Sequence, residues 1–456
     1  MVAPHPDIIA SAQLAQDAWD YCITPLLPVE DIRNAGLNLY QSGEGVRLTD
    51  YDGNVFLDMM SSHTRANSLG YGNTEIAQAV AEQLSTLHYV GTVANFAEPT
   101  IRLAKRIAEK APGNLSRVLF TSGGSEAVEA ALKMAKQYQV QSGNKPRAHK
   151  VISRWNAYHG ATMGAMAATD WLNIRHMNEP AVPGFSFIPG PMNYRNPFGM
   201  DEEAYANYCA DYLEQQILHE GPEMVAAFIG EPVMQAHGVQ IAPASYLQRV
   251  RDICDKYGVL WINDEVITGF GRTGNWFAIE RAGVVPDIMT FAKAMTAGYA
   301  PMGGFITTPA IAGALTAYRH VHTFSGHAGS AAAANAVMTI KERDGLIEQS
   351  RVNGAYFLDA LQEVLEPLPI VGQVRGVGMW LAVDFTKDQL TREPFADDTV
   401  AAIVRRMRDY GVIASAIGTS FEMAPPLITS RSDLDDVTKI AEKSIREVAQ
   451  ERRLHE

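Results

Sequence analysis

Two isolated charged side chains follow apolar runs and are of the types that cofactor chemistry uses. Between Lys256 and Arg272 the only charged residues are Asp264 and Glu265, which end the run VLWIN, and Lys293 is the sole charged residue from 288 to 318. A buried carboxylate needs a cationic partner. Desolvation lowers the pKa of a lysine by about 3 to 5, which frees its amine to attack a carbonyl. Asp264 alone would be more typical of a residue that caps a strand end or a turn, and Lys293 alone of a lysine that reaches the surface. Together they indicate a cofactor site.

A glycine turn in front of a predicted helix adds an anion site. In LFTSGGSEAVEAALKMAK a short strand leads through Gly123 and Gly124 into a helix expected from Ser125. Backbone N–H groups and the dipole of such a helix N-terminus attract anions, and the Ser122 and Ser125 hydroxyls stand beside them. The turn predicts a phosphate site, although alone it is equally typical of a plain connection.

The stretch INDEVITGFGRTG offers a competing interpretation, because Gly269, Gly271 and Gly274 have the spacing of a dinucleotide loop. Such a loop lies directly between a strand and a helix, with an acidic residue about 20 positions later. Here the first glycine comes four residues after Glu265, and NWFAIERAG is a poor start for a phosphate-binding helix. An NAD-dependent dehydrogenase is therefore a distant alternative.

Apolar strands that alternate with helices must position these side chains. The runs RVLF (117–120), VIS (151–153), VAAFIG (225–230), VLWIN (259–263) and DIMTFA (287–292) are separated by helical patterns, which predicts a mainly parallel sheet between helices. A second helix is expected from Ser245, with Gly258 as its C-terminal cap. Ligands of such sheets bind beyond the carboxyl ends of the strands. We expect a large domain at 76–340 and a smaller α+β domain built from 1–75 and 341–456.

Composition favours a small-molecule enzyme. The chain has 456 residues, of which 47% are hydrophobic and 20% charged, and its net charge is -13. This sign argues against nucleic acid and anionic lipid as partners. Cys22, Cys209 and Cys254 suit neither a disulfide framework nor a metal site. No apolar run reaches the length of a membrane span, and the N-terminus shows no targeting signal, so we expect a cytoplasmic protein.

The combined features resemble the pyridoxal-phosphate (PLP) enzymes of fold type I, and among them the class III aminotransferases. The resemblance runs from about residue 35 to about residue 445. Its motifs are TSGGSEAVEAALK, AYHGATMGA, FIGEPV, WINDEVITGFGRTG, FAKAMTAGYAPMGG, HTFSGH, RGVGMW and APPLIT. It implies a large domain with a mainly parallel seven-stranded sheet. It also implies a homodimer with shared active sites and leaves pairing into tetramers open.

The resemblance assigns roles to single residues. It implies that Lys293 carries the cofactor and acts as the base, that Asp264 faces the pyridine nitrogen, and that Tyr158 and Val266 cover the two ring faces. Thr323 would contribute to the phosphate site of the neighbouring subunit. The implied cofactor-binding residues are Gly124, Ser125, Tyr158, Glu231, Asp264, Val266, Lys293 and Thr323.

Substrate recognition departs from the family pattern. Members that act on ornithine or γ-aminobutyrate resemble EPxQGE, but this chain reads EPVMQA with Ala236 last, so it is closer to the ω-amino acid:pyruvate and amine:pyruvate group. That group usually has an arginine where this chain has Ser415. We expect Arg65, in SSHTRANSLGYG, to bind a substrate or acceptor carboxylate through its bidentate fork; the alternative is that it is an exposed surface arginine. Tyr89 and Trp171 are candidates for the pocket lining.

The expected activity is a ping-pong transfer of an amino group, through pyridoxamine phosphate, from a primary amine or ω-amino acid to a keto acid such as pyruvate. Two other readings stay open. The same residues could serve an aminomutase, a racemase or epimerase, or a decarboxylase, because the bond held perpendicular to the ring is the one that breaks. A non-catalytic protein could also retain the fold, although an intact Lys293 and Asp264 argue against it.

Overall fold

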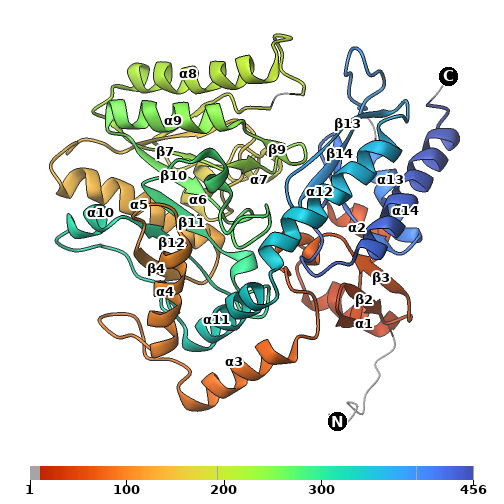
Figure 1. Ribbon diagram of the computed structural model, residues 1–456, viewed down its shortest axis with the longest axis horizontal. Coiled ribbons are helices and arrows are strands. Elements are labelled where there is room, and N and C mark those ends of the chain that lie inside the picture. The colour runs from red at the N-terminus through yellow and green to blue at the C-terminus, as the bar shows by residue number, and fades with distance from the viewer. Residues whose placement is uncertain (1–10, 193, 397, 455–456) are drawn as a thin grey trace.

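The computed structural model describes residues 11–192, 194–396 and 398–454. A seven-stranded sheet with the order β4-β12-β11-β10-β7-β5-β6 forms its centre (Figure 1). Strands from β11 to β6 run parallel, whereas β12 runs antiparallel to β11 and β4. The mainly parallel seven-stranded sheet is confirmed. Its strands are β4 (Arg117–Thr121), β5 (Lys150–Arg154), β6 (Phe185–Ile188), β7 (Val225–Gly230), β10 (Leu260–Asp264), β11 (Ile288–Phe291) and β12 (Gly303–Thr307).

Both faces of this sheet are covered by helices, because successive strand residues point to opposite sides. Ile152, Phe228 and Trp261 pack into a core with α8 and α9, which lie side by side in Figure 1. Val151 and Ile262 pack on the other face with α5. The first face holds α4 (Glu98–Lys110), α8 (Glu202–Glu220), α9 (Ala244–Tyr257) and α11 (Ala328–Arg343), and the second holds α5 (Gly124–Gln141), α6 (Met163–Ala167) and α10 (Pro309–Gly313).

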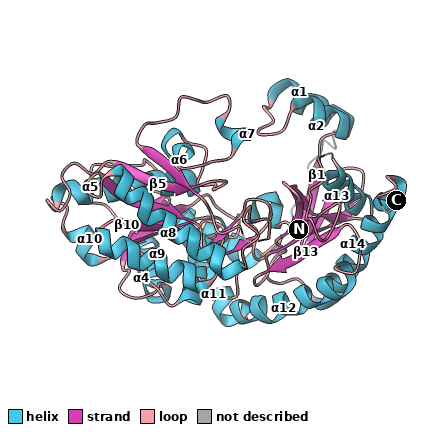
Figure 2. Ribbon diagram, turned by 90° about the horizontal axis from the view of Figure 1, so that it is seen from above, coloured by secondary structure: helices cyan, strands magenta, loops and turns pink. Residues whose placement is uncertain are grey.

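The two ends of the chain meet beside the large sheet, where Figure 2 shows β1 and β13 apart from β5 and β10. Strand β15 pairs in parallel with β3 and closes the sheet β1-β2-β3-β15, and a second sheet has the order β13-β14-β17-β16. These strands are β1 (Tyr40–Glu44), β2 (Arg47–Asp50), β3 (Val55–Asp58), β13 (Val371–Gly376), β14 (Leu381–Phe385), β15 (Val412–Ile413), β16 (Ser415–Ile417) and β17 (Ser420–Met423). The domain boundaries near residues 75 and 340 stay a prediction.

The remaining elements frame these layers. They are α1 (Ser11–Tyr21), α2 (Val29–Ala35), α3 (Thr74–Thr86), α7 (Leu172–Arg175), α12 (Leu346–Leu365), α13 (Thr399–Asp409), α14 (Arg431–Glu451), and the short strands β8 (Val233–Met234) and β9 (Gln240–Ile241). None of the helices in the described part of the chain combines the length and hydrophobicity needed to cross a bilayer. The first ten residues, where the sequence predicts no targeting signal, lie outside the described ranges.

The glycines of GFGRTG serve packing. Gly271 has a φ of 103°, and a Cβ on it would lie 2.6 Å from Cδ1 of Ile347. A Cβ on Gly274 would lie 2.8 Å from Cβ of Arg351. Both neighbours belong to α12, so the glycines let this loop approach that helix closely.

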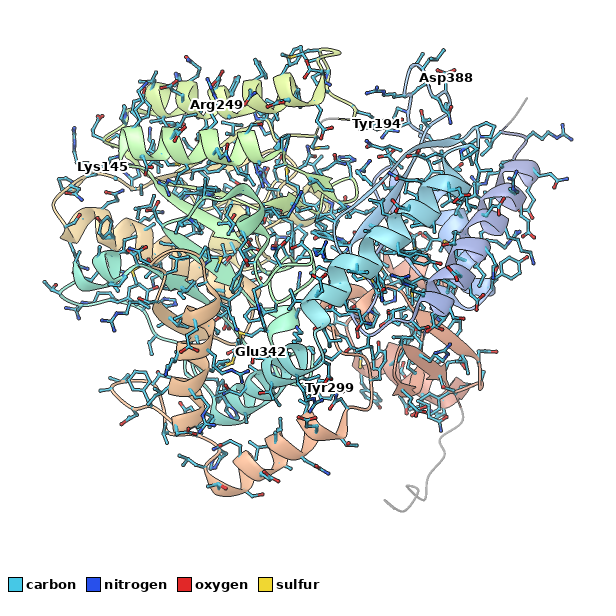
Figure 3. All side chains as sticks on the ribbon, in the orientation of Figure 1. Lys145, Tyr194, Arg249, Tyr299, Glu342 and Asp388 are labelled. Atoms are coloured by element: carbon cyan, nitrogen blue, oxygen red, sulfur yellow. The ribbon has the colours of Figure 1, made fainter. Side chains whose placement is uncertain are left out.

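A buried lysine ties this loop to the turn that carries Lys293. Lys341 of α11 is fully buried, and its Nζ donates to the carbonyl oxygens of Phe270 at 2.9 Å and Ala294 at 2.7 Å. Burial, with the nearby Arg272 charge, lowers the pKa of Lys341 well below its ordinary value. The next residue, Glu342 (Figure 3), instead faces Arg106 and Lys110 of α4. Helix α11 therefore braces the Lys293 turn through the hydrogen bond from Lys341 to Ala294.

We expect Lys341→Met to lower the free energy of unfolding by about 2 kcal/mol, because two buried carbonyl groups lose their donor. Urea denaturation followed by circular dichroism measures the change. The matched control, Lys105→Met, removes a lysine whose side chain is 78% exposed and should change stability by less than about 0.5 kcal/mol. Equal midpoints for the two variants would contradict the bracing role.

Candidate active site

The carboxyl ends of five strands surround one cavity. Strand β4 is antiparallel to β12 and so runs in the same direction as β11, which places its carboxyl end at the same edge as those of β5, β7, β10 and β11. The residues just beyond these ends enclose a cavity of about 130 Å³. Its lining is Gly124, Ser125, Tyr158, His159, Gly160, Glu231, Val233, Asp264, Val266, Ile267, Thr268 and Lys293. Seven of the eight predicted cofactor-binding residues thus lie together, and Thr323 does not.

Asp264 is held as an oriented acceptor at the end of β10. One carboxylate oxygen accepts from the Val266 N–H at 3.0 Å and from the Thr290 hydroxyl at 2.9 Å, and the other lies 2.6 Å from Nδ1 of His159. The His159 Nε2 is buried and has no partner among the described residues. Nδ1 is therefore assigned as the donor to Asp264. A carboxylate retains further lone pairs, so Asp264 can still accept from a ring nitrogen in the cavity.

Glu231 is also paired within the protein. Its carboxylate accepts from Nη2 of Arg154 at 3.0 Å, and the same nitrogen donates to the Glu231 carbonyl oxygen at 2.7 Å. Both side chains are buried. The other carboxylate oxygen lies 3.4 Å from the Tyr158 N–H. Glu231 therefore helps to orient the loop that carries Tyr158.

An open helix end forms the opposite side of the cavity. No side chain of the described residues caps the N-terminus of α5, so its first N–H groups remain available for an anion. The Ser125 hydroxyl accepts from the Ala161 N–H at 3.2 Å. A Cβ on Gly160 would lie 2.6 Å from this hydroxyl oxygen, and one on Gly124 would lie 2.8 Å from Cγ1 of Val266. The glycines thus keep this end of the cavity narrow and lined by backbone.

Lys293 reaches the cavity from a strained turn after β11. Its φ is +45°, which is uncommon for a residue with a side chain. Burial lowers the pKa of its amine to about 8, and the charge of Arg65 acts in the same direction, whereas Asp264 acts against it. Tyr299, which is labelled in Figure 3, follows this turn. Its hydroxyl accepts from the Asn73 N–H at 2.7 Å. The chain just after Lys293 is therefore held by contacts at Ala294 and at Tyr299.

Thr323 and Tyr89 lie together outside this cavity. The Tyr89 hydroxyl donates to the Thr323 carbonyl oxygen at 2.5 Å, and the Tyr89 ring stacks on His327. The surrounding surface is apolar and exposed, with Val93 77% and Phe96 69% accessible. This face bears the features expected of a contact with another subunit.

Trp171, another predicted substrate residue, lines a second, smaller pocket, whose lining does not include Arg65 or Ser415. Trp171 meets Tyr158 edge to face at 5.6 Å between ring centroids, and both line this pocket with Gln235. Ser415 begins β16, where it lies directly opposite Glu422 of β17. The guanidinium of Arg65 binds the Glu422 carboxylate through two bonds of 2.6 Å. Arg65 is therefore buried and paired with the protein itself, which removes the alternative of a surface arginine.

Sequence reasoning missed several functional partners. His159 and Arg154 support Asp264 and Glu231, and Glu422 and Gln235 surround Arg65. His159 directly follows Tyr158 in the motif AYHG. This position next to a predicted cofactor-binding residue was the signal that could have identified it. Glu422 is the sole charged residue between Asp409 and Arg431. The same kind of isolation identified Lys293, so it was the available signal for Glu422.

The residues present fit PLP. An unsatisfied helix N-terminus with a serine hydroxyl matches a phosphate, and a fixed carboxylate at the far end matches a pyridine N–H. Tyr158 and Val266 offer the flat aromatic and branched apolar surfaces that a ring needs on its two faces. Lys293 supplies an amine with a lowered pKa. Gly124, Ser125, Tyr158, Asp264, Val266 and Lys293 could together hold the cofactor.

Comparison with known proteins points the same way. A family model described as aminotransferase class-III matches residues 32–445. The chain is 35% identical to a putrescine–pyruvate aminotransferase of Pseudomonas aeruginosa, over 94% of this chain and 95% of that protein. It superposes with a TM-score of 0.93 on an (S)-enantioselective ω-transaminase from Thermomicrobium roseum, at 36% identity over 97% and 100% of the two chains. An ω-transaminase from Pseudomonas jessenii in complex with PMP gives 0.92 at 31% identity, over 96% and 98%.

The lowered pKa of Lys293 predicts how its amine titrates. In PLP-free protein the amine should be protonated and unreactive below pH 8 and reactive above it. The rate of its reductive methylation, measured by mass spectrometry of the Lys293 peptide, should therefore rise with pH around a midpoint near 8. Asp264→Asn should move this midpoint lower, because the ammonium loses a favourable anion. A midpoint near the ordinary value of about 10.4 would contradict this assignment.

Proposed function

Because the chain belongs to the class III aminotransferase family, we propose that Lys293 and Asp264 carry out amino-group transfer from a primary amine or ω-amino acid to a keto acid such as pyruvate. The enzyme is a PLP-dependent aminotransferase. One observation supports the residue assignment above all. Lys293, Asp264 and the open N-terminus of α5 converge on a single cavity at the carboxyl edge of the sheet.

Several residues of this cavity have a proposed task. Backbone N–H groups at Gly124 and Ser125 would hold the phosphate, and Tyr158 and Val266 would cover the two faces of the ring. Asp264, fixed by Thr290 and His159, keeps the ring nitrogen protonated. When bound, PLP supplies the electron-accepting ring that acidifies the substrate carbon next to the nitrogen.

Lys293 performs the proton transfer. Its Nζ would take the proton from the substrate carbon that bears the amino group and hold it for delivery to the cofactor carbon on the other side of that nitrogen. This role requires a neutral amine, and a pKa of about 8 makes about a tenth of the amine neutral at pH 7, far more than an ordinary lysine would supply. Lys341 donates to the carbonyl oxygen of the next residue, Ala294, and so helps to fix the backbone beside Lys293.

The proposed assembly is a homodimer in which Thr323 of each subunit completes the phosphate site of the other. Support comes from the exposed apolar surface around Thr323, which includes Val93, Phe96 and Phe324, and from the fact that Thr323 does not line the cavity of its own subunit. We also place the enzyme in the cytoplasm, since Cys22, Cys209 and Cys254 are free thiols.

Lys293→Ala tests the proposed function. Transamination between an amine donor and pyruvate should fall by about 10³-fold or more, because the variant has no base at the reacting carbon. Borohydride should trap no cofactor at position 293. Keto product formation and peptide mass spectrometry measure these effects. Lys105→Ala, on an exposed helix surface, is the control that should retain full activity, and substantial turnover by Lys293→Ala would refute the assignment.

Mixing two inactive variants tests the shared site. Thr323→Arg should bind PLP poorly, because the bulky cation disturbs the partner's phosphate site, and Lys293→Ala is inactive for a different reason. A mixed dimer has one site with both changes and one site with neither. Co-refolding equal amounts should therefore recover about a quarter of the unmodified activity, as random pairing predicts. No recovery, with mixed dimers demonstrated by native mass spectrometry, would show that Thr323 does not cross between subunits.

A further inference from the structure

Arg65 uses every one of its N–H groups within the protein. Nε and Nη2 donate to the two carboxylate oxygens of Glu422 at 2.6 Å each, and Nη1 donates to the His63 carbonyl oxygen at 3.2 Å. With the Gln235 amide oriented so that its oxygen faces the guanidinium, that oxygen accepts the remaining N–H groups of Nη1 and Nη2 at 3.1 Å. A guanidinium has five donors, so Arg65 has none left for a ligand.

Glu422 is equally fixed. Its side chain is fully buried on β17, whereas that of Arg65 is 9% exposed. One of its oxygens also accepts from Nε1 of Trp380, a fully buried residue that precedes β14. Glu422 therefore stands on a rigid strand and is fastened by two neighbours.

The pair borders the site where the substrate must bind. The charge of Arg65 lowers the pKa of Lys293, and Glu422 acts against it. Gln235 contacts Arg65 and lines the pocket with Tyr158 and Trp171. The pair therefore faces the substrate end of the active site through Gln235.

We propose that the Arg65–Glu422 pair stays closed during turnover and makes this end of the pocket electrically neutral, so that the enzyme selects amine donors without a distal carboxylate. This inference rests on the proposed function, whose donor class it narrows. A ligand carboxylate could reach the guanidinium fork only by displacing Glu422. That would strand a buried carboxylate with Trp380 as its remaining partner, which is costly. The distal part of the donor instead meets the Tyr158 and Trp171 rings and the Gln235 amide.

Equilibrium binding to the holoenzyme tests this directly. The probes are 3-phenylpropanoate and 3-phenylpropanamide, which match in shape, differ in charge and carry no amine. Calorimetric titration should give dissociation constants within about threefold of each other for the unmodified protein. Glu422→Gln should bind the carboxylate about tenfold or more tightly than the amide, because it frees a cation while keeping side-chain volume. Arg65→Gln combined with Glu422→Gln should abolish that preference.

Glu393→Gln, which removes an acidic partner from an exposed pair with Lys387, is the matched control and should behave like the unmodified protein. A preference of about tenfold or more for the carboxylate in the unmodified protein would overturn the proposal. A Glu422→Gln variant that gains no preference for the carboxylate would also overturn it, because Glu422 would then not be what prevents Arg65 from binding a ligand.

A kinetic comparison separates this inference from the proposed function. The unmodified enzyme should use butylamine with a higher kcat/KM than 4-aminobutyrate, and Glu422→Gln should reverse the order mainly through KM. If the protein transaminates no donor, the proposed function is refuted. The binding titrations would still show whether the Arg65–Glu422 pair stays closed. Turnover that favours 4-aminobutyrate in the unmodified enzyme would refute the inference alone.

Discussion

The requirement that buried charges be paired organises the whole site. A carboxylate or guanidinium removed from water is stable only if it is neutralised and hydrogen-bonded. Glu231 meets this requirement through Arg154, and Asp264 is held by hydrogen bonds from His159, the Thr290 hydroxyl and the Val266 N–H. Lys341 meets it differently, because burial lowers its pKa and two carbonyl oxygens accept from it. These pairs leave Lys293 as the amine that faces the cavity, and its lowered pKa follows from the same burial.

Local sequence signals predicted five strands of the large sheet and the charged residues at its edge. The strands β4, β5, β7, β10 and β11 were expected because each contains a short apolar run, and the α5 turn because glycines and serines precede a helical pattern. Strands β6 and β12 were not among these runs, and the total of seven strands came from the family resemblance. Since parallel strands present their carboxyl ends at one edge, Asp264 and Lys293 could be expected near each other from their isolation alone. The roles of Tyr158 and Val266 came from family resemblance, and periodicity gave no access to them.

Long-range partners could not be predicted in this way. Arg65 and Glu422 are 357 positions apart in the chain and belong to opposite ends of it. Glu422 alternates with buried apolar neighbours in SFEM, so its charge was visible but its partner was not. His159 and Gln235 carry no unusual spacing. A pairwise contact between distant segments depends on how β3, β15 and β17 are brought together, and that arrangement is a property of the folded small domain.

The segment that carries Arg65 determines whether its guanidinium can exchange partners. Ser415 lies opposite Glu422 across β16 and β17, and the cation that pairs with this carboxylate, Arg65, comes from the N-terminal loop. That loop is itself fixed, because Asp58 accepts from the Ser62 N–H at 2.7 Å and Nη2 of Arg272 donates to the Ser61 hydroxyl at 2.9 Å. An arginine held by a fixed loop and saturated by five acceptor contacts has little freedom to exchange partners. Tertiary pairing, more than residue type, therefore sets the charge that a substrate meets.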